Sequence, residues 1–459
     1  MRKKRRKGAK SVMQYKIPEG AARILEILET AGHEAYLVGG CVRDLLRGAE
    51  PHDLDICTSA KPEETRTCFA KSKLIETGIK HGTLTVIENG EPCEITTYRT
   101  DLGYSDRRRP DAVVFVTSLY EDLRRRDFTM NAIAMDRRGT IRDPFDGRGD
   151  ILRKRVRCVG EPDLRLQEDG LRVMRGLRFA ATLSYDIEPE TAAALHRNRG
   201  MLKYVAAERV REELGKLLTG AGAAKILREY PDIPLEFWPE LGPLMELEQR
   251  NPWHCWGGWE HTLHTLEAAP PDLILRLTML LHDIGKPSCK RTGEDGIDRF
   301  HGHQAAGAEL ADGMLRALRF DNRTRQEVTS LIALHDDQLT AKESDIRRRL
   351  NRMGPERFFR LLDVKQADKL GQNPEKAGPV LAELPLIRAK AETILAERQC
   401  LTLRDLAVNG RDVLAAGVTP GREVGRILNG LLEQVLNGET PNERVALLKR
   451  IKNAAERIN

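Results

Sequence analysis

The chain has 459 residues, of which 40% are hydrophobic and 31% charged; this length allows roughly three domains of ordinary size and excludes a single small core. The formal net charge is +6, but seven basic side chains lie within the first ten residues, so the rest of the chain is nearly neutral. Any binding to nucleic acid must therefore come from local clusters of charge. No apolar run approaches the roughly 20 residues that cross a bilayer, which predicts a soluble protein without membrane contact.

The basic start of the chain, residues 1–15, is followed by no apolar stretch, which argues against a secretory signal and predicts a solvated, flexible arm. Such an arm either only keeps the protein soluble or also contacts RNA phosphates, and both interpretations stay open. The eight cysteines are dispersed and include no Cys-x-x-Cys pair. This spacing predicts reduced thiols and a cytoplasmic protein.

Residues 16–150 alternate helical and strand-like stretches and predict a domain of the α+β class. The expected elements are a helix over 21–31, a strand over 34–38, a helix over 41–46, and strands over 83–88 and 93–98. Asn89-Gly90 is typical of a hairpin turn and would join the last two strands. From residue 151 the pattern is almost entirely helical, and breaks near 230 and 375 predict helical segments over 151–230, 231–375 and 376–459.

Two aspartates in Pro51-His-Asp-Leu-Asp55 form the first candidate site. On an extended chain Asp53 and Asp55 project from the same face, where both can bind divalent cations. Transfer of a nucleotide uses two such ions, about 3.5 to 4 Å apart, and these ions prefer oxygen ligands. Glu94, in a strand-like run, is the natural third carboxylate. An isolated Asp-x-Asp is more often a solvated turn, so this prediction depends on the surrounding pattern.

Gly39-Gly40 lies upstream of these aspartates, where a strand leads into a helix. The absence of two side chains lets backbone N–H groups approach phosphate oxygens at the positive end of that helix. Arg43 lies one turn further on. The order of strand, Gly-Gly, helix, Asp-x-Asp and strand carboxylate favours a metal-dependent site for nucleotide transfer.

A second candidate site lies in the helical stretch 168–178. Asp169, Arg172 and Arg175 follow one another at a spacing of three residues, and Arg178 continues the row, so we expect them on one helix face. A salt-bridged exposed helix is the common origin of this spacing. Alternatively, a carboxylate beside a guanidinium offers an acceptor and fixed donors that can pair with the edge of cytosine or adenine.

A third candidate site follows from five histidines gathered within about forty residues, in Trp259-Glu-His-Thr-Leu-His264, Leu280-Leu-His-Asp283 and His301-Gly-His303. An adjacent His-Asp pair at the end of an apolar helix can give two ligands to one cation. Imidazole with carboxylate suits manganese, nickel, iron or magnesium better than a metal that prefers thiolates. Histidines that only cap helices or fill the core are the alternative.

The run Leu37-Val-Gly-Gly-Cys-Val-Arg-Asp-Leu-Leu46, followed by Asp53-Leu-Asp55, resembles the head-domain signature of the tRNA nucleotidyltransferase and poly(A) polymerase family. The resemblance implies a polymerase-beta-like sheet with helices in the head, followed by an all-α neck, a body and a tail. It also implies two Mg²⁺ at Asp53 and Asp55. The segment Asp122-Leu-Arg-Arg-Arg-Asp-Phe-Thr-Met-Asn-Ala132 is similar to a further family element, which implies that three residues contact ribose and phosphates. These are Arg126, Asp127 and Asn131.

The stretch after Glu168 resembles the amino-acid template of the class II enzymes of this family, which implies that Asp169 and Arg172 select CTP or ATP. Arg175 and Arg178 would help to hold the triphosphate, and Ala207-Glu-Arg-Val-Arg-Glu-Glu213 resembles an element that supports this helix. Asp106-Arg-Arg-Arg-Pro110 resembles the end of a flexible loop, whose presence favours addition of the complete CCA sequence.

The histidine-rich region resembles the HD phosphohydrolase superfamily. The resemblance implies His261, His282 and Asp283 as metal ligands with Asp368 as the distant fourth, and His303 and His335 as further candidates. Such a domain in a nucleotidyltransferase either hydrolyses phosphorylated or cyclic-phosphate RNA ends or retains only the fold. Residues 376–459 resemble the family's tail, which implies a helical module that binds tRNA.

The motifs of this sequence are therefore compatible with three functions. The first is addition of C, C and A to the 3′ end of tRNA from ATP and CTP. The second keeps this chemistry but makes poly(A), or adds only CC or only A. The third is an HD phosphohydrolase whose head only binds RNA. The sequence makes no prediction of the oligomeric state.

Overall fold

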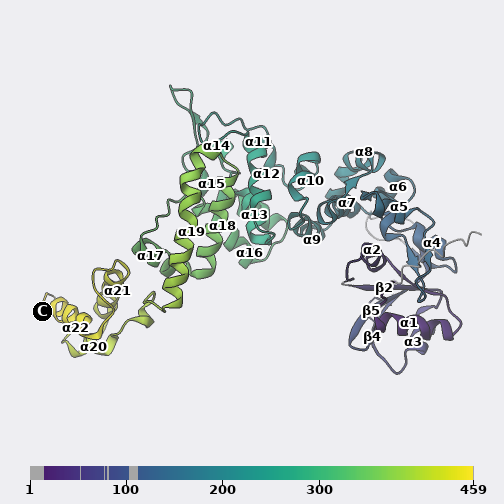
Figure 1. Cartoon of the computed structure of the whole chain (residues 1–459), viewed down its shortest axis with the longest axis horizontal. Helices are drawn as coiled ribbons and strands as arrows, with labels where there is room; N and C mark the ends of the chain where they lie inside the picture. The colour runs from purple at the N-terminus through teal and green to yellow at the C-terminus, as the bar shows by residue number, and fades with distance from the viewer. Residues whose placement is uncertain (1–14, 52, 77, 80–81, 103–111, 458–459) are drawn as a thin grey trace, which may run out of the picture. The chain divides into compact units, whose positions relative to one another are not determined.

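The computed structural model describes residues 15–51, 53–76, 78–79, 82–102 and 112–457. The basic arm up to residue 14 and the arginine-rich segment 106–110 lie outside these described residues. The chain forms two compact units, Met1–Phe237 and Trp238–Asn459 (Figure 1). Among the described residues, no helix is both long enough and apolar enough to span a membrane.

A seven-stranded sheet organises the start of the first unit, in the order β3-β4-β5-β2-β1-β8-β9. Its strands are β1 Ala35–Val38, β2 Leu54–Thr58, β3 Lys73–Ile75, β4 Thr83–Glu88, β5 Glu91–Thr97, β8 Ala134–Met135 and β9 Ile141–Arg142. The central strands β2 and β5 run parallel, and all other neighbouring strands of the sheet are antiparallel. The mixed sheet confirms the predicted α+β class.

The register of the sheet separates an apolar face from a polar one. Leu37, Ile56, Ile95 and Leu84 are partners across four neighbouring strands, and each is at most 1% exposed. Helix α1, Glu19–Thr30, contacts these strands. Because side chains alternate along a strand, the residues next to this apolar row project from the opposite face of the sheet.

The hairpin between β4 and β5 fixes this register. Asn89 and Gly90 both have positive φ, 50° and 82°, as a tight two-residue turn requires and as the sequence predicted. The turn pairs Glu88 with Glu91 and carries the antiparallel pairing back to Thr83 and Thr96. Strand β5 therefore reaches β2 with its polar residues on the same face as those of β2.

The rest of the first unit is mainly helical. It contains α2 Gly40–Leu46, α3 Pro62–Cys68, α4 Leu119–Arg124, α5 Gly147–Leu152, α6 Pro162–Glu168, α7 Leu171–Leu183, α8 Pro189–Asn198, α9 Ala207–Leu218 and α10 Ala223–Glu229. A small hairpin of β6 Arg99–Leu102 and β7 Ala112–Phe115 precedes α4, and β10 Arg155–Val156 pairs with β11 Asp186–Ile187. Phe128 lies edge-on to Phe179 of α7, with ring centroids 5.7 Å apart. This contact joins α7 to the core of the head.

The second unit is helical apart from a short hairpin of β12 Arg291–Thr292 and β13 Asp298–Arg299. Its helices are α11 Leu241–Met245, α12 Gly258–Ala268, α13 Leu273–Leu281, α14 Lys286–Cys289, α15 His303–Ala317, α16 Asn322–Leu334, α17 Glu343–Met353, α18 Pro355–Leu370, α19 Pro374–Ala396, α20 Gly410–Ala415, α21 Arg422–Leu436 and α22 Arg444–Ala455. Helices α12, α13, α16 and α18 pack against one another. Helices α20 to α22 share a separate core, in which Val413, Leu436, Leu447 and Ile451 are fully buried.

Candidate functional site

Three carboxylates meet on the polar face of the sheet. Asp53 precedes β2, Asp55 lies within it, and Glu94 of β5 is the partner of Asp55 across the parallel pair. All three line a cleft of about 1200 Å³. Burial raises the pKa of Asp55, and the charges of Glu94 and Asp53 raise it further, while Arg126 lowers it. A cluster of carboxylates that repel one another, with only oxygen donors, fits Mg²⁺.

Gly39 lets the backbone approach this cluster closely. Its φ of +74° favours glycine, and an added Cβ would lie 3.2 Å from Oδ2 of Asp55 and 3.3 Å from Nη1 of Arg126. The buried carboxylate of Asp122 accepts a hydrogen bond of 3.1 Å from Arg126, which holds this guanidinium in place. Any side chain at position 39 would push on both charged groups.

If the activity implied by the sequence resemblance holds, Gly39→Ala is expected to lower nucleotide incorporation roughly 10²-fold, because a small displacement of reacting groups costs about this much. The measurement is the initial rate at which CTP is incorporated into tRNA that lacks its 3′-terminal CCA, the substrate that this resemblance implies. Gly32→Ala is the matched control, since Gly32 has a similar φ of +88° but no atom within 4 Å of an added Cβ. Equal losses in the two variants would show that backbone strain, not the site, is responsible.

A chain of hydrogen bonds connects the helix after Gly39 to α7. Nη1 of Arg43 donates to Oδ1 of Asn131 over 3.0 Å, and Nδ2 of Asn131 donates to Oδ1 of Asp127 over 3.1 Å. Nε of Arg175 donates to the other oxygen of Asp127 over 2.8 Å. Asp127 and Asn131 are both buried. Four of the residues predicted to contact the nucleotide therefore form one network.

Three guanidinium groups gather around the ring of Phe179. The Cζ atoms of Arg43, Arg175 and Arg178 lie 5.2, 5.4 and 3.7 Å from its centroid. The buried Glu213 of α9 partly balances their charge, with 2.7 Å to Arg178 and 3.7 Å to Arg175. Asp44 pairs with Arg43 and Asp127 pairs with Arg175, so an aromatic face and carboxylates hold all three guanidinium groups in place, where they can bind a polyanion such as a triphosphate.

The structure corrects the expected arrangement of the second candidate site. Helix α6 ends at Glu168 and α7 begins at Leu171, so Asp169 lies between them with extended backbone, φ −142° and ψ 108°. It therefore does not share a helix face with Arg172 and Arg175, because the continuous helix that the spacing predicted is interrupted there. Arg209 of α9 donates to Oδ2 of Asp169 over 2.9 Å.

Arg172 is held by the protein itself. Its guanidinium pairs with Glu168 and donates to the carbonyl oxygens of Arg165 and Arg125 over 2.7 and 3.1 Å. Each polar group of Asp169 and Arg172 that could read a base therefore has a protein partner beside it. Such partners fix the orientation of these side chains before a nucleotide arrives.

The buried pair of Asp127 and Arg175 makes stability depend on pH. Burial alone would raise the pKa of Asp127, but Arg175 and a hydrogen bond from Asn131 lower it below its ordinary value. In the unfolded chain the pKa of an aspartate is about 3.9. Because the pKa of Asp127 is lower in the folded protein, its ionised form stabilises the fold at pH values above about 3.9, and this stabilisation is lost as the pH falls from there towards the folded-state pKa.

Asp127→Asn is therefore expected to lower the free energy of unfolding by about 3 kcal/mol at pH 7, since it removes the nearer of the two buried carboxylates beside Arg175 and leaves only Glu213, 3.7 Å away. The difference from the unchanged protein should begin to shrink below about pH 4, because Asp127 then takes up a proton in the unfolded chain while it stays ionised to lower pH in the folded protein. Urea unfolding at pH 7, 5 and 3.5 measures this difference. A constant difference across the series would exclude the ionised pair as its cause.

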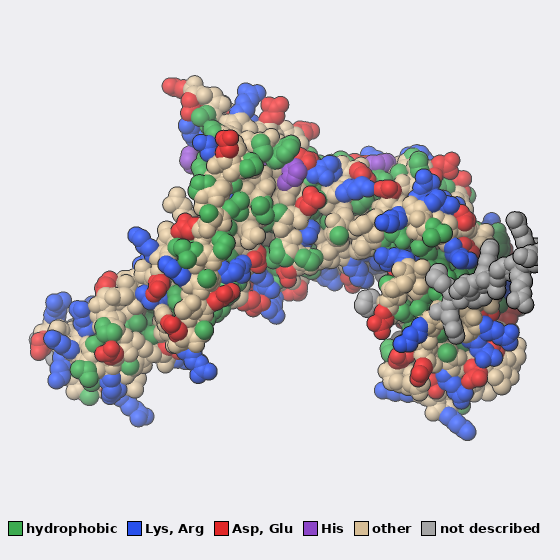
Figure 2. All heavy atoms as spheres, in the orientation of Figure 1, with side chains coloured by type: hydrophobic (Ala, Val, Ile, Leu, Met, Phe, Trp, Pro, Cys, Tyr) green, Lys and Arg blue, Asp and Glu red, His purple; other side chains and the backbone are tan. Residues whose placement is uncertain are grey.

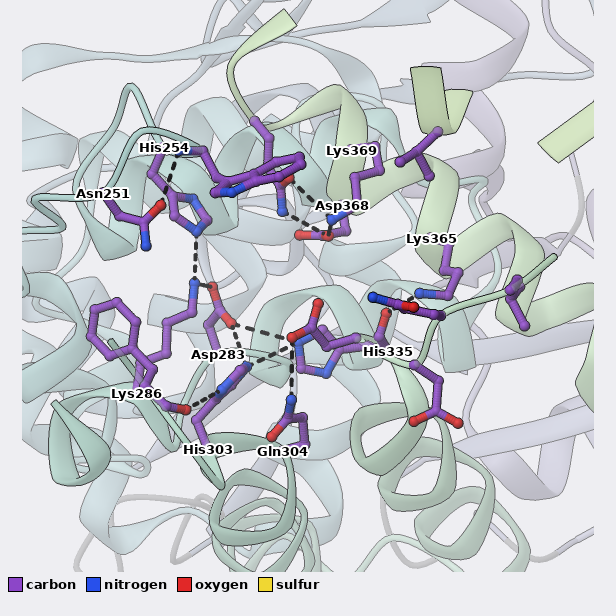
Figure 3. Close-up of a pocket in the computed structure, with 18 of the residues that line it drawn as sticks. Asn251, His254, Asp283, Lys286, His303, Gln304, His335, Lys365, Asp368 and Lys369 are labelled. Carbon is purple, nitrogen blue, oxygen red and sulfur yellow. Dashed lines mark hydrogen bonds and ion pairs between the residues drawn. The ribbon is translucent and has the colours of Figure 1, made fainter. Parts of the chain in front are cut away.

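The third set of predicted residues meets inside the second unit. His261 comes from α12, His282 and Asp283 directly follow α13, and Asp368 lies on α18; all four are at most 3% exposed. Nε2 of His261 lies 3.2 Å from Oδ1 of Asp368 and 3.4 Å from Oδ2 of Asp283. Nε2 of His282 lies 3.3 Å from Oδ2 of Asp283 and 3.6 Å from Oδ1 of Asp368. Figure 3 shows the cavity beside this centre.

Backbone carbonyls set the orientation of these imidazoles. Nδ1 of His261 lies 3.0 Å from the carbonyl oxygen of Gly371, and Nδ1 of His282 lies 2.8 Å from that of Met279. A carbonyl accepts only, so each Nδ1 donates its proton there and each Nε2 faces the carboxylates, where it can bind a cation in place of a second proton. This is the arrangement in which histidine binds a metal.

The charges of the centre also fit a cation. Burial alone would lower the pKa of His282, but Asp283 and Asp368 raise it to about 10. The pKa of each of these two carboxyls lies well below its ordinary value despite burial, because of the histidines and of Lys286 or Lys369. Two buried carboxylates thus attract positive charge to the point between the imidazoles, and nitrogen with oxygen donors suits a divalent transition metal.

Several individual contacts of these sites were not predicted. Arg209 and Glu213 lie one turn apart on α9 and reach Asp169 and Arg178 across the fold. Their segment was expected to support the second candidate site, but only packing reveals which partners they bind. Phe179 carried no signal beyond its place in an apolar stripe. Lys286, three residues after Asp283, lies 2.7 Å from that carboxylate.

A mixed sheet that carries a carboxylate cluster, beside a cationic cluster on a following helix, defines a nucleotidyltransferase. Residues 35–157 match the family model of the poly A polymerase head domain. Residues 184–230 match "Probable RNA and SrmB- binding site of polymerase A", and residues 304–451 match "tRNA nucleotidyltransferase domain 2 putative".

Similar proteins narrow this class. The CCA-adding enzyme of Lactobacillus delbrueckii subsp. bulgaricus is 38% identical over 431 residues, which cover 93% of this chain and 96% of that protein. The enzyme of Leuconostoc citreum is 53% identical over 207 residues, 45% of this chain and 51% of that protein. The crystal structure of the Bacillus stearothermophilus CCA-adding enzyme in complex with CTP is 31% identical, with a TM-score of 0.71 over 96% of this chain and 98% of that chain. The chain belongs to the family of CCA-adding enzymes.

Proposed function

We propose that this chain adds C, C and A to the 3′ end of tRNA from CTP and ATP without a nucleic-acid template. The observation that carries the proposal is the alignment of Asp55 with Glu94 across two parallel strands, with Asp53 in the same cleft. Similar proteins support the choice of nucleotides, because they are named CCA-adding enzymes and the crystal structure of one of them contains CTP.

Asp53 and Asp55 would hold two Mg²⁺, with Glu94 beside them. Bound Mg²⁺ would activate the 3′ hydroxyl of the tRNA and neutralise charge on the triphosphate. The oxygen of that hydroxyl forms a bond to the α-phosphorus, and the bond from this phosphorus to pyrophosphate breaks. Arg43, Arg175 and Arg178 bind the phosphate oxygens, while Gly39 and Gly40 leave room for them beside the backbone.

Asp169 and Arg172 choose the base in this proposal. Cytosine and adenine each present an amino donor next to a ring-nitrogen acceptor, which pair with a carboxylate and a guanidinium. Uracil and guanine present a carbonyl oxygen where the amino group would be, and this oxygen would face the carboxylate of Asp169. Arg209 and Glu168 hold these two side chains in the orientation that meets the base.

Arg172→Ala tests this selection. In competition among all four nucleoside triphosphates, the unchanged protein is expected to incorporate only CTP and ATP, and the variant to lose about 10- to 100-fold in discrimination, as one bidentate pair is worth. Arg197→Ala is the matched control, because Arg197 lies in the same unit on an exposed ion pair with Asp163. If the variant loses rate equally for all nucleotides, base selection by Arg172 is wrong.

Each part of the chain has a role in this proposal. Residues 16–150 form the catalytic head, 151–230 the base-selecting neck, 231–375 the body, and 376–459 the tail. Figure 2 draws many Lys and Arg side chains over the tail helices, and those of α22 and the residues after it are exposed: Arg444, Lys449, Arg450, Lys452 and Arg457. We assign the tail to the tRNA backbone, which such groups bind. We also place the protein in the cytoplasm, since all eight cysteines are free thiols.

A second function is proposed for the buried centre of His261, His282, Asp283 and Asp368. Its lone pairs and carboxylates converge on one point, which favours a bound divalent cation and an HD-type phosphohydrolase. RNA ends with a phosphate or a 2′,3′-cyclic phosphate would be its substrates. The test is to incubate the protein with such RNA in the presence of Mn²⁺ or Ni²⁺. Either the release of inorganic phosphate or the opening of the 2′,3′-cyclic phosphate is then measured.

A further inference from the structure

The buried carboxylate of Asp122, on α4, lies between two arginines of the first unit. Its Oδ1 atom accepts hydrogen bonds from Nε and Nη2 of Arg125 over 3.1 and 2.7 Å. Its Oδ2 atom accepts a hydrogen bond from Nη2 of Arg126 over 3.1 Å. Burial alone would raise the pKa of Asp122, but Arg126 and Arg125 lower it below its ordinary value. The carboxylate is therefore ionised and holds both guanidinium groups at once.

Arg126 connects Asp122 to the carboxylate cluster. A Cβ added at Gly39 would lie 3.3 Å from Nη1 of Arg126 and 3.2 Å from Oδ2 of Asp55, so these two charged groups flank one backbone position. The other nitrogen of the same guanidinium, Nη2, donates to Asp122. Asp122 thus fixes where the guanidinium lies beside Asp55.

Arg125 connects Asp122 to the residues that are proposed to read the base. Its carbonyl oxygen accepts hydrogen bonds from Nη2 of Arg172 over 3.1 Å and from Nη1 of Arg165 over 3.2 Å. Its guanidinium donates to the carbonyl oxygen of Arg99 over 3.1 Å, as well as to Asp122. The side chain of Arg125 therefore holds the peptide group to which Arg172 is bound.

Arg165 strengthens the connection between α4 and the base-reading segment. Its guanidinium donates to the carbonyl oxygens of Arg124 and Val159 over 2.9 and 3.1 Å, and it pairs with Glu168 over 2.5 Å. Glu168 in turn pairs with Arg172. Carbonyl groups at the end of a helix have no partner within it, and here guanidinium groups supply one. Arg172 therefore cannot shift relative to α4 without loss of several hydrogen bonds.

We propose that Asp122 is a positioning residue that keeps the base-reading side chain of Arg172 in register with the carboxylate cluster. The proposal rests on the proposed addition of C, C and A and adds a residue that touches neither the base nor the metal ions. Arg125 and Arg126 are neighbours in the chain, so a base that displaces Arg172 also displaces Arg126 beside Asp55. A mismatched nucleotide consequently loses rate as well as binding.

Asp122→Asn tests the proposal, because an amide has one acceptor oxygen and cannot accept hydrogen bonds from both arginines through two oxygens. On tRNA that lacks its 3′-terminal CCA, kcat and KM are measured for CTP and, separately, for UTP, whose base has a carbonyl oxygen where cytosine has an amino group. We expect kcat for CTP to fall about 10²-fold. We expect the preference for CTP over UTP in kcat/KM to fall about 10-fold, as weakened recognition of one base edge would give.

Arg125→Met separates the two connections, because it removes the donors to Asp122 Oδ1 and leaves the pair of Arg126 with Asp122 in place. The preference for CTP should fall about as much as in Asp122→Asn, whereas kcat for CTP should fall less. In an Arg172→Ala background, neither change should reduce the preference further, because effects that act through one residue are not additive.

Leu28→Ala is the matched control for a loosened head, because Leu28 is fully buried on α1 and takes part in none of these hydrogen bonds. Thermal unfolding gives a temperature at which every variant is folded, and at that temperature the control should keep its preference for CTP. A folded Asp122→Asn protein with the unchanged preference, or a loss that adds fully to that of Arg172→Ala, would overturn the positioning role. An unchanged protein without preference for CTP over UTP would instead overturn the proposed base selection, and this inference with it.

Discussion

Asp55→Ala is expected to reduce incorporation of CTP and ATP into tRNA by at least about 10³-fold. Transfer of a nucleotide depends almost wholly on positioned charge, and Asp55 is the carboxylate that lies between Asp53 and the strand of Glu94. Burial and the charges of Glu94 and Asp53 raise its pKa, so its removal relieves a desolvation cost and this repulsion and should not unfold the head. Single-turnover incorporation at saturating Mg²⁺ measures the chemical step.

Asp186→Ala controls for a general effect of losing a carboxylate, because Asp186 lies in the same unit but is largely exposed, in an ion pair with Lys225. The control should retain full activity. Incorporation by Asp55→Ala at more than a tenth of the unchanged rate would show that the carboxylate cluster is not the metal site.

Asp283→Ala is expected to abolish hydrolysis of phosphorylated RNA ends, by about 10³-fold or more, and to leave CTP incorporation unchanged. This residue lies between two groups of histidines, His261 with His282 and His303 with His335, so its loss removes a ligand of the cation proposed for the HD-type centre. It belongs to the second unit, whereas the carboxylate cluster belongs to the first. Measuring both activities on one preparation separates the two centres.

His301→Ala, at the edge of the cavity beside this centre but outside both groups of histidines, is the matched control for this change. It should retain most of the hydrolysis. Equal loss of both activities in Asp283→Ala would mean that the second unit had lost its fold, which circular dichroism would reveal. Hydrolysis that survives in a folded Asp283→Ala protein would exclude this centre as its source.

The head could be anticipated largely from local patterns. Alternation along a strand places Asp53 and Asp55 on one face, and Asn89-Gly90 predicts the hairpin that aligns Glu94 with Asp55. The ranges of the predicted strands could also be derived from the sequence, because the apolar residues of one sheet face recur at every second position. The position of Gly39 also follows from sequence, since only a residue without a side chain fits between strand and helix there.

Interactions between distant segments could not be anticipated in the same way. Spacing alone suggested a continuous helix through Asp169, but the chain breaks at this residue and Arg209 holds its carboxylate. The sharing of Asp283 between two pairs of histidines depends on how α15 and α16 pack, which no periodicity encodes. Sequence thus identified the reacting residue types, while packing decided which of them share a partner.

One chain is proposed to build the complete CCA sequence, and sequencing of the product tests this directly. The protein is incubated with tRNA that ends before CCA, with CTP alone, ATP alone, or both. We expect two cytidines with CTP alone, and CCA followed by arrest with both nucleotides. Long adenosine tails on unrelated RNA, or arrest after two cytidines when ATP is also present, would contradict the account.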